Sequence, residues 1–335
     1  SPLPFWDEWA YVTPQQHFEA WFAPHNEHRL IFPRLFFVLD MWLGAHGVLN
    51  LVCILGVQLL HVALLMRVLR TEASAPSVVW LITVVGVLLL WVYQLGNFGW
   101  GFQLQFVGVY ALASAAFTAL LFARTTLALI CAVLAAGTMA NGVLVALLLP
   151  LLAWFIGLNR RAVMAWCVLA ALLFTMFLWG YLQARNAVHT PDVPPRHVFE
   201  QLSLMAQYLG VYLGGPASVY RRFVSLGMAV GFASLGVVAV LLWDALKHRA
   251  TYTRPQALLL TIVAFVLGTA LLTTLGRYDN VEGLAQASAS RYGTPVLIYW
   301  LCLILLLQQR FFSVGLLGAR WRRGFSTLVV LGLCS

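Results

Sequence analysis

Long apolar stretches without charged residues recur along the chain and are separated by short polar segments. A helix needs about 20 mainly apolar residues to cross a bilayer, because the hydrocarbon core is about 30 Å thick. The pattern predicts nine membrane-spanning helices, at residues 47–66, 78–96, 104–123, 125–140, 143–158, 162–182, 224–243, 256–275 and 294–309. A tenth apolar run begins at Phe325. We therefore expect an all-α, polytopic membrane protein with about nine or ten transmembrane helices.

Residues 125–158 are interpreted as two short helices. One helix of that length would measure about 50 Å, well beyond the thickness of the hydrocarbon core. Asn141 and Gly142 are polar or flexible residues in the middle of the stretch, and they mark the expected break. The central part of the chain should therefore contain a pair of short helices.

The distribution of charge predicts which loops face which side. Lys and Arg accumulate in short cytoplasmic loops. Alternating the nine spans places twelve of the 20 Lys and Arg on one side and nine of the 11 acids on the other. The basic side is expected to be cytoplasmic, and residues 1–46, 97–103, 183–223 and 276–293 to face outward. Residues 201–215 are also uncharged, but a crossing there would move the basic cluster at 247–254 outside, so an interfacial or re-entrant segment is predicted.

Composition narrows the class of protein. Hydrophobic residues make up 62% of the chain and charged residues only 9%, which excludes a water-soluble globule. The net charge is +9, but the basic residues lie between apolar runs instead of on one face, so no nucleic-acid partner is expected. Residues 1–335 are interpreted as a single transmembrane domain, truncated at both ends. It comprises an outward first loop with amphipathic helices (1–46), a first helix group (47–182), an outward loop (183–223) and a second helix group (224–335).

Two acids in the first outward loop are the candidate catalytic residues. Asp7 and Glu8 lie between Trp6 and Trp9. Aromatic surroundings lower the local dielectric constant, which makes a carboxylate a better proton acceptor. The alternative is a belt of aromatic anchors at the lipid headgroups, with solvated acids. The belt is favoured for the tryptophans alone, and a function is favoured for the acids because no basic partner is nearby.

A second polar cluster in this loop is predicted to bind substrate. It consists of His25, Asn26, Glu27, His28 and Arg29. The two histidines share a helical face at a spacing of three, so a divalent metal is an open possibility. No third ligand is identifiable and the H-E-x-x-H motif is absent, so we expect no metal and no cofactor. A hydrogen-bonding surface for a hydroxyl-rich ligand such as a sugar is the favoured interpretation. The following residues, 30–43, are predicted to form an amphipathic helix on the membrane surface.

Another outward turn, rich in glycine, places amide side chains beside aromatic rings. Asn97, Trp100 and Gln103 are its candidate substrate-binding residues. Glycines permit tight turns, and aromatic faces next to amides suit a carbohydrate. A simple hairpin with belt aromatics is an equally good interpretation.

The last outward loop carries arginine on the side that basic residues usually avoid. Its candidate substrate-binding residues are Arg277, Ser290, Arg291 and Tyr292. Arginine binds phosphate through its planar fork, and phosphates at headgroup depth belong to lipids. The alternative is an ordinary contact of snorkelling arginines with anionic headgroups. These arginines lie on the outward side, which basic residues usually avoid, and this favours a function.

This layout resembles the GT-C superfamily of integral membrane glycosyltransferases, which use polyprenyl-phosphate-linked sugars as donors. The resemblance rests on the acidic, aromatic first loop, the short paired helices around Asn141 and the late loop that carries Arg291. Segments 25–29 and 97–103 also look like those of uncharacterised bacterial members. In such enzymes a first-loop carboxylate acts as base and a late basic residue steadies the lipid phosphate. The resemblance assigns these roles to Asp7 or Glu8 and to Arg277 or Arg291.

The resemblance implies inverting transfer of a sugar at the outer face of the bacterial cytoplasmic membrane. The expected partners are the polyprenyl-phosphate-linked sugar, membrane lipids and a glycan, lipid or protein acceptor of the cell envelope. Metal dependence is not expected, because Asp7-Glu8 is not a D-x-D motif. Two alternatives stay open: a polymerase or ligase that uses a lipid-diphosphate-linked glycan, and a transporter or flippase without chemistry. Few polar residues lie in the predicted spans, which favours an enzyme over a transporter.

Overall fold

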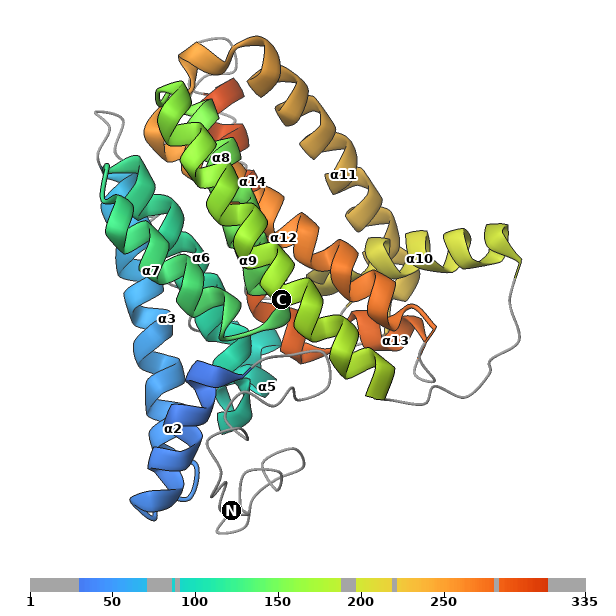
Figure 1. Cartoon of the computed structure of the whole chain (residues 1–335). Helices are drawn as coiled ribbons and strands as arrows, with labels where there is room; N and C mark the ends of the chain where they lie inside the picture. Colours follow the sequence, from blue (N-terminus) through green and yellow to red (C-terminus); the bar gives the residue numbers. More distant parts are fainter. Residues whose placement is uncertain are drawn as a thin grey trace.

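The computed structural model describes residues 30–70, 86–87, 91–187, 197–218, 222–279 and 283–312. Within these ranges the ordered elements are all helices, and no strand occurs (Figure 1). The all-α class predicted from the hydropathy pattern is therefore confirmed. Most of the expected span at 78–96 and the apolar run that begins at Phe325 lie outside the described residues.

Six of the described helices are long and apolar enough to cross a membrane, which supports an integral membrane protein. They run lengthwise through the molecule in Figure 1. They are α3 (Val48–Leu69), α6 (Leu104–Leu121) with the short turn η5 (Gly101–Gln103) before it, α9 (Arg160–Ala187), α11 (Val224–Lys247), α12 (Arg254–Arg277), and α13 (Leu284–Ala287) together with α14 (Gly293–Leu307). Each corresponds to one of the predicted spans.

The central pair of helices forms a hairpin of two short helices. Its arms are α7 (Thr125–Ala136) and α8 (Val143–Phe155), joined by the turn η6 (Ala140–Gly142). The predicted break at Asn141-Gly142 is confirmed. The arms have 12 and 13 residues and are about 20 Å long, so they are shorter than the six helices that are long enough to cross a membrane, and the two crossings expected here stay a prediction. Gly142 is required at the tip, since a Cβ atom there would overlap the carbonyl of Ala135.

Both arms of the hairpin meet the same end of the bundle. The Arg254 guanidinium lies 5.9 Å from the centre of the Phe122 ring, just before α7 begins. The Arg249 guanidinium donates a hydrogen bond of 3.1 Å to the carbonyl of Trp154, at the end of α8. The tip instead contacts α6 and α12 through Asn141, and α2 (Ile31–Trp42), where the Phe32 N–H donates to the carbonyl of Gly137 at 3.3 Å. The hairpin therefore starts and ends at one end of the bundle.

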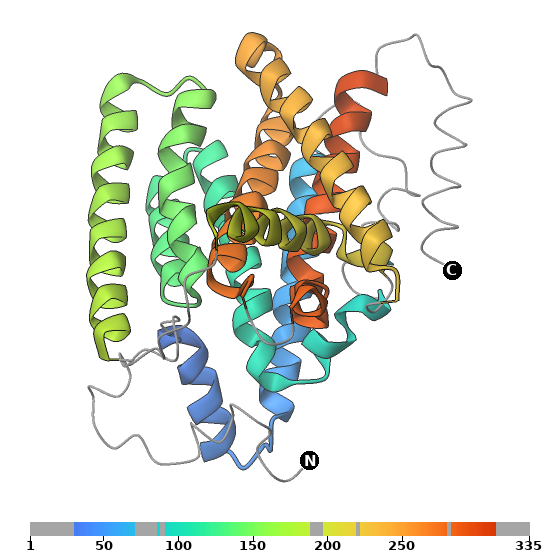
Figure 2. The same ribbon diagram turned by 90° about the vertical axis from the view of Figure 1, so that its right-hand side faces the viewer.

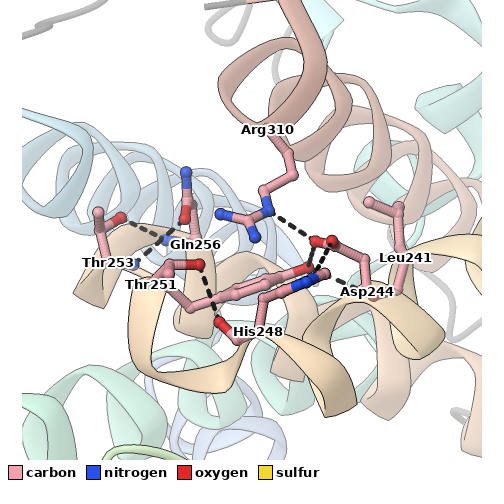
Figure 3. A network of polar contacts seen from close by, with 8 residues as sticks. Leu241, Asp244, His248, Thr251, Thr253, Gln256 and Arg310 are labelled. Carbon is pink, nitrogen blue, oxygen red and sulfur yellow. Dashed lines mark hydrogen bonds and ion pairs between the residues drawn. The ribbon is translucent and has the colours of Figure 1, made fainter. Parts of the chain in front are cut away.

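One polar network closes this end, which we call the basic end. The Asp244 carboxylate accepts hydrogen bonds from Arg310 Nε (2.6 Å) and the Tyr252 hydroxyl (3.0 Å), and lies 2.8 Å from His248 Nδ1 (Figure 3). Its members come from the end of α11, the turn between α11 and α12, and the π-helical turn η10 (Gln308–Phe312) after α14. Close by, Thr253 caps α12 through a reciprocal pair of hydrogen bonds with Gln256 (Figure 3).

The helix α10 (Val198–Leu213) runs crosswise to α11 in both views (Figures 1 and 2). Two pairs of glycines let the backbones touch. Gly214 faces Gly227 and Gly210 faces Gly231, and a Cβ on Gly214 or Gly231 would overlap the opposite carbonyl. Small residues four apart permit such close approach of membrane helices. The crosswise course agrees with the prediction that residues 201–215 are not a crossing.

The amphipathic helix expected at 30–43 is present as α2 (Ile31–Trp42), with its polar side turned inward. Asp40 is buried and accepts hydrogen bonds from the backbone N–H groups of Gly47 (2.6 Å) and Leu49 (2.9 Å), at the start of α3. A carboxylate there satisfies free N–H groups and favours the helix dipole. Leu35 and Trp42 are exposed on the other side. The side of α2 that is buried is the side that carries Asp40, because Asp40 caps α3, and hydropathy alone does not reveal this.

Candidate functional site

Two loops that are nearly 200 residues apart in the sequence meet at the end of the bundle opposite the basic end. Asn97, in α5 (Leu95–Phe98), donates hydrogen bonds to Thr294 Oγ1 (2.9 Å) and to the carbonyl of Arg291 (3.4 Å). The Thr294 hydroxyl donates to Gln94 Oε1 at 2.7 Å. The predicted residue Asn97 therefore fixes the backbone of the predicted residue Arg291. We call this end, where α5, α10 and η9 (Ser290–Tyr292) meet, the aromatic end.

The two loops pack together without space for further side-chain atoms. A Cβ on Gly96 would clash with the side chain of Ser290, and one on Gly293 would clash with the carbonyl of Tyr93. The Tyr93 hydroxyl also donates to the carbonyl of Ser288 at 3.1 Å. This close packing holds the backbone of η9 in place.

Both predicted arginines lie near one tyrosine of α10. The charges of Arg277, at the end of α12, and of Arg291, in η9, both influence the Tyr208 hydroxyl. Arg291 is half-buried, its guanidinium carbon lies 5.3 Å from the centre of the Tyr292 ring, and its Nε has no hydrogen-bond partner among the described residues. Guanidinium groups in such a position favour the binding of an anion.

Beside them lie four buried tyrosines, Tyr110, Tyr208, Tyr212 and Tyr292, which we call the tyrosine cluster. The Tyr212 and Tyr292 rings are 4.9 Å apart between centres. The Tyr208 hydroxyl lies near that of Tyr292, and the Tyr212 hydroxyl near that of Tyr110. Neither Tyr208 nor Tyr212 makes a well-formed hydrogen bond within the described residues. Burial raises the pKa of both phenols, so they keep their protons and can donate.

The tip of the hairpin formed by α7 and α8 reaches this cluster. The Asn141 amide nitrogen donates to the Tyr110 hydroxyl (3.3 Å) and to Thr269 Oγ1 (3.1 Å). Its side chain is 5% exposed, and its Oδ1 atom has no partner among the described residues. The hairpin therefore presents a hydrogen-bond acceptor to the interior of the bundle.

The remaining residues predicted in the glycine-rich turn lie elsewhere. Trp100 stacks on Phe102, with 5.2 Å between ring centres, and Phe102 stacks on Phe37 of α2 at 5.6 Å. Gln103 is buried at the start of α6. The structure thus joins Asn97 to the arginine loop and directs Trp100 towards α2, so the expected platform of three residues is divided.

Several predicted site residues lie outside the described residues. They are Asp7, Glu8, His25, Asn26, Glu27, His28 and Arg29. The assignment of a base and of a polar first-loop surface therefore stays a prediction. Within the described ranges, no three His, Cys, Asp or Glu side chains come together as a metal site would require.

Sequence reasoning missed most of the tyrosine cluster. Tyr208 and Tyr212 are spaced by four in an uncharged helix, which was a detectable signal for a shared face. Tyr110 lies inside an apolar span, and only the tertiary structure brings it to Asn141. The sequence predicts a span that begins at Thr294, and it gives no sign that the Thr294 hydroxyl accepts a hydrogen bond from Asn97.

Comparison with protein-family models, curated proteins and solved structures gives no match. A function therefore has to be argued from the geometry of the aromatic end and from the sequence pattern.

Proposed function

We propose that the chain is an integral membrane glycosyltransferase that moves a sugar from a polyprenyl-phosphate donor to an acceptor hydroxyl. The observation that carries the proposal is Arg291, a half-buried arginine with an unpartnered Nε atom at one end of an apolar helix bundle. The Tyr292 ring and Tyr208 lie near it, and Asn97 donates a hydrogen bond to its backbone carbonyl. An amphiphile with a phosphate and a hydroxyl-rich headgroup suits such surroundings.

The proposed chemistry is an inverting substitution at the anomeric carbon. Asp7 or Glu8 accepts the proton of the acceptor hydroxyl while the oxygen of that hydroxyl attacks the anomeric carbon of the donor sugar. The bond from the anomeric carbon to the phosphate oxygen breaks, and the lipid phosphate leaves with the electron pair. Arg291 and Arg277 stabilise the negative charge that grows on this phosphate. No metal is part of the proposal, because guanidinium groups already serve the leaving group.

The orientation of the chain is part of the same proposal. The basic end carries the cluster of Lys and Arg residues at 247–254, which is typical of a cytoplasmic side. The aromatic end then faces the exterior of a bacterial cytoplasmic membrane, where the acceptor is a glycan, lipid or protein of the cell envelope.

Binding of the donor lipid is the first test. The probe is a short-chain polyprenyl phosphate that carries one hexose, added to the protein in nanodiscs. We expect Arg291→Ala to weaken its binding by about tenfold to a hundredfold, because a hydrogen bond to a charged group is lost. The matched control is Arg222→Ala at the start of α11, an exposed arginine whose guanidinium lies over the Phe223 ring. Equal affinities of the two variants would contradict the proposal.

Transfer of the hexose to acceptors tests the base. A positioned base contributes roughly 10² to 10⁴ in rate, so the double variant Asp7→Asn with Glu8→Gln should lose that factor and still bind donor. Unchanged transfer when both acids and both arginines are replaced would refute the enzymatic proposal.

A transporter is the second candidate, and one observation favours it. His61, 1% exposed in α3, lies with Nε2 2.8 Å from the Ser114 hydroxyl of α6, well inside the bundle. Ionisable residues within spans and interrupted helices are typical of transport proteins. Reconstituted vesicles separate the two candidates: a glycosyltransferase transfers the hexose without moving a labelled lipid between leaflets, whereas a flippase does the reverse.

A further inference from the structure

Four buried polar atoms without a well-formed hydrogen bond lie in one connected group at the aromatic end. Among the described residues they are Asn141 Oδ1, Arg291 Nε and the hydroxyls of Tyr208 and Tyr212, which lie beside Tyr292 and Tyr110. Each such atom costs about 1 to 3 kcal/mol when left unsatisfied, and native proteins contain few of them. Several within one connected group indicate that a bound molecule supplies the missing hydrogen bonds.

The chemistry of these atoms restricts that molecule. Two phenols and a guanidinium N–H offer donors, and the Asn141 amide oxygen offers an acceptor. An apolar lipid chain satisfies neither kind. A phosphate ester that carries a sugar satisfies both, because its phosphate oxygens accept and its hydroxyls donate. Phenol rings also suit the apolar faces of a sugar.

The order of the groups gives the site a direction. Arg277 and Arg291 act on Tyr208 at one side of the tyrosine cluster. Tyr212 stands between Tyr292, whose ring it contacts, and Tyr110, which accepts a hydrogen bond from Asn141. Positive charge is therefore concentrated at the arginine side, and neutral hydrogen-bonding groups continue to the hairpin tip.

We propose that the tyrosine cluster and Asn141 bind the sugar of the lipid-linked donor, with the phosphate at Arg291 and the sugar directed towards the tip of the hairpin. This assignment rests on the proposed function and adds a sugar-recognition role for residues that no motif in the sequence marks. It predicts that hydroxyl groups of the cluster distinguish the glycosylated lipid from the bare lipid phosphate.

The test compares two probes, a short-chain polyprenyl phosphate and the same lipid with one hexose, in nanodiscs that hold the full chain. Tyr212→Phe removes a single hydroxyl. We expect it to weaken binding of the glycosylated lipid by about five- to tenfold and to leave the bare lipid phosphate unchanged. Arg291→Ala should weaken binding of both probes.

A purely structural role of the hydroxyl predicts a different result. Because the Tyr212 hydroxyl has no well-formed hydrogen bond, Tyr212→Phe should keep or raise Tm in the absence of lipid. The matched control is Tyr299→Phe in α14. Tyr299 is also fully buried, but its hydroxyl donates to Ser234 Oγ at 2.9 Å. This control should lower Tm and leave the affinities for both probes unchanged.

The outcomes separate this assignment from the proposed function. If Tyr212→Phe and Tyr208→Phe bind both probes as the wild type does, the assignment is wrong, while a loss in Arg291→Ala still supports the enzyme. Equal weakening for both probes, or a lower Tm without a change in preference, also overturns the assignment. If the wild type binds neither probe, both proposals fall. Should Tyr212→Phe not fold, Tyr208→Phe alone decides by the same criterion.

Discussion

A carboxylate at the basic end and two polar groups at the aromatic end differ in how well they are satisfied. At the basic end, the Asp244 carboxylate accepts from Arg310 and Tyr252 and meets His248. At the aromatic end, the Tyr212 hydroxyl and Arg291 Nε make no well-formed hydrogen bond among the described residues. Polar groups that a fold leaves without good partners are expected at functional sites. Our proposal therefore places ligand binding at the aromatic end and a contribution to stability at the basic end.

The aromatic end is nevertheless held rigidly, by close contact of backbones. Gly231 brings α11 against α10, and Gly293 brings the arginine loop against Tyr93. Fixed positions of donors reduce the reorganisation that binding of charge requires. The Tyr212 hydroxyl and Arg291 Nε therefore lack well-formed hydrogen bonds on a backbone that is closely packed.

The largest effect is expected at the crossing of α10 and α11. Gly231→Ala places a methyl group on the carbonyl of Gly210 and should lower the free energy of unfolding by about 3 kcal/mol. Gly236→Ala, in the same helix, meets open space and should be neutral or stabilise the protein by about 0.5 kcal/mol. Unfolding in detergent measures both variants. Equal stability would mean that the crossing is looser than described.

The next effect concerns the basic end. The Asp244 carboxylate is shared by three partners, and Asp244→Asn removes its charge. The change should cost about 2 kcal/mol of stability, because the Arg310 guanidinium loses its ionised partner. Affinity for the glycosylated lipid should stay the same. The control Lys247→Gln changes an exposed residue of the same helix, whose ammonium lies 4.3 Å from the Trp243 ring centre. A selective loss of lipid affinity in Asp244→Asn would contradict the division between the ends.

A smaller effect on stability is expected from Asn97→Ala. The change removes the hydrogen bonds to Thr294 and to the Arg291 carbonyl and should cost about 1 kcal/mol. Because the Arg291 backbone loses its support, affinity for the bare lipid phosphate should fall severalfold. Titration of both lipids, beside Tm, measures the two consequences. A fall in Tm with full affinity would show that Asn97 does not position the arginine.

The smallest effect is expected from Arg249→Gln at the basic end. The guanidinium lies 4.6 Å from the Trp154 ring centre and bonds the Trp154 carbonyl near the surface. Its loss should cost about 0.5 kcal/mol and leave lipid binding intact. Measured affinity equal to that of the wild type would sharpen the contrast with Arg291→Ala.

The sequence predicted the helices better than it predicted their contacts. Long apolar windows located α3, α11 and α12 to within a few residues, because length and hydropathy are local properties. The length of residues 125–158 also predicted the break at Asn141. It did not predict how short α7 and α8 are, because a count of apolar residues does not distinguish a crossing helix from a shorter arm of a hairpin.

The candidate site was predicted only in part, for a related reason. Asn97 and Arg291 were chosen for their chemistry in outward loops, and the fold joins them. The neighbours of Tyr212, Tyr110 and Tyr292, come from α6 and η9, and such contacts between distant parts of the sequence have no local signature. Trp100 had the same chemistry as a binding residue, but its stacking on Phe102 directs it elsewhere.

The hairpin formed by α7 and α8 also has a consequence for how the protein is made. Its arms of 12 and 13 residues are shorter than the roughly 20 residues of an independent span, so each is expected to rely on helices that are already in place. Because α7 begins and α8 ends at the same end of the bundle, the pair leaves the direction of the following helices unchanged. Assembly of the Asn141 tip with α12 must then await synthesis of residues beyond 254, so the interior of the bundle is completed late in translation.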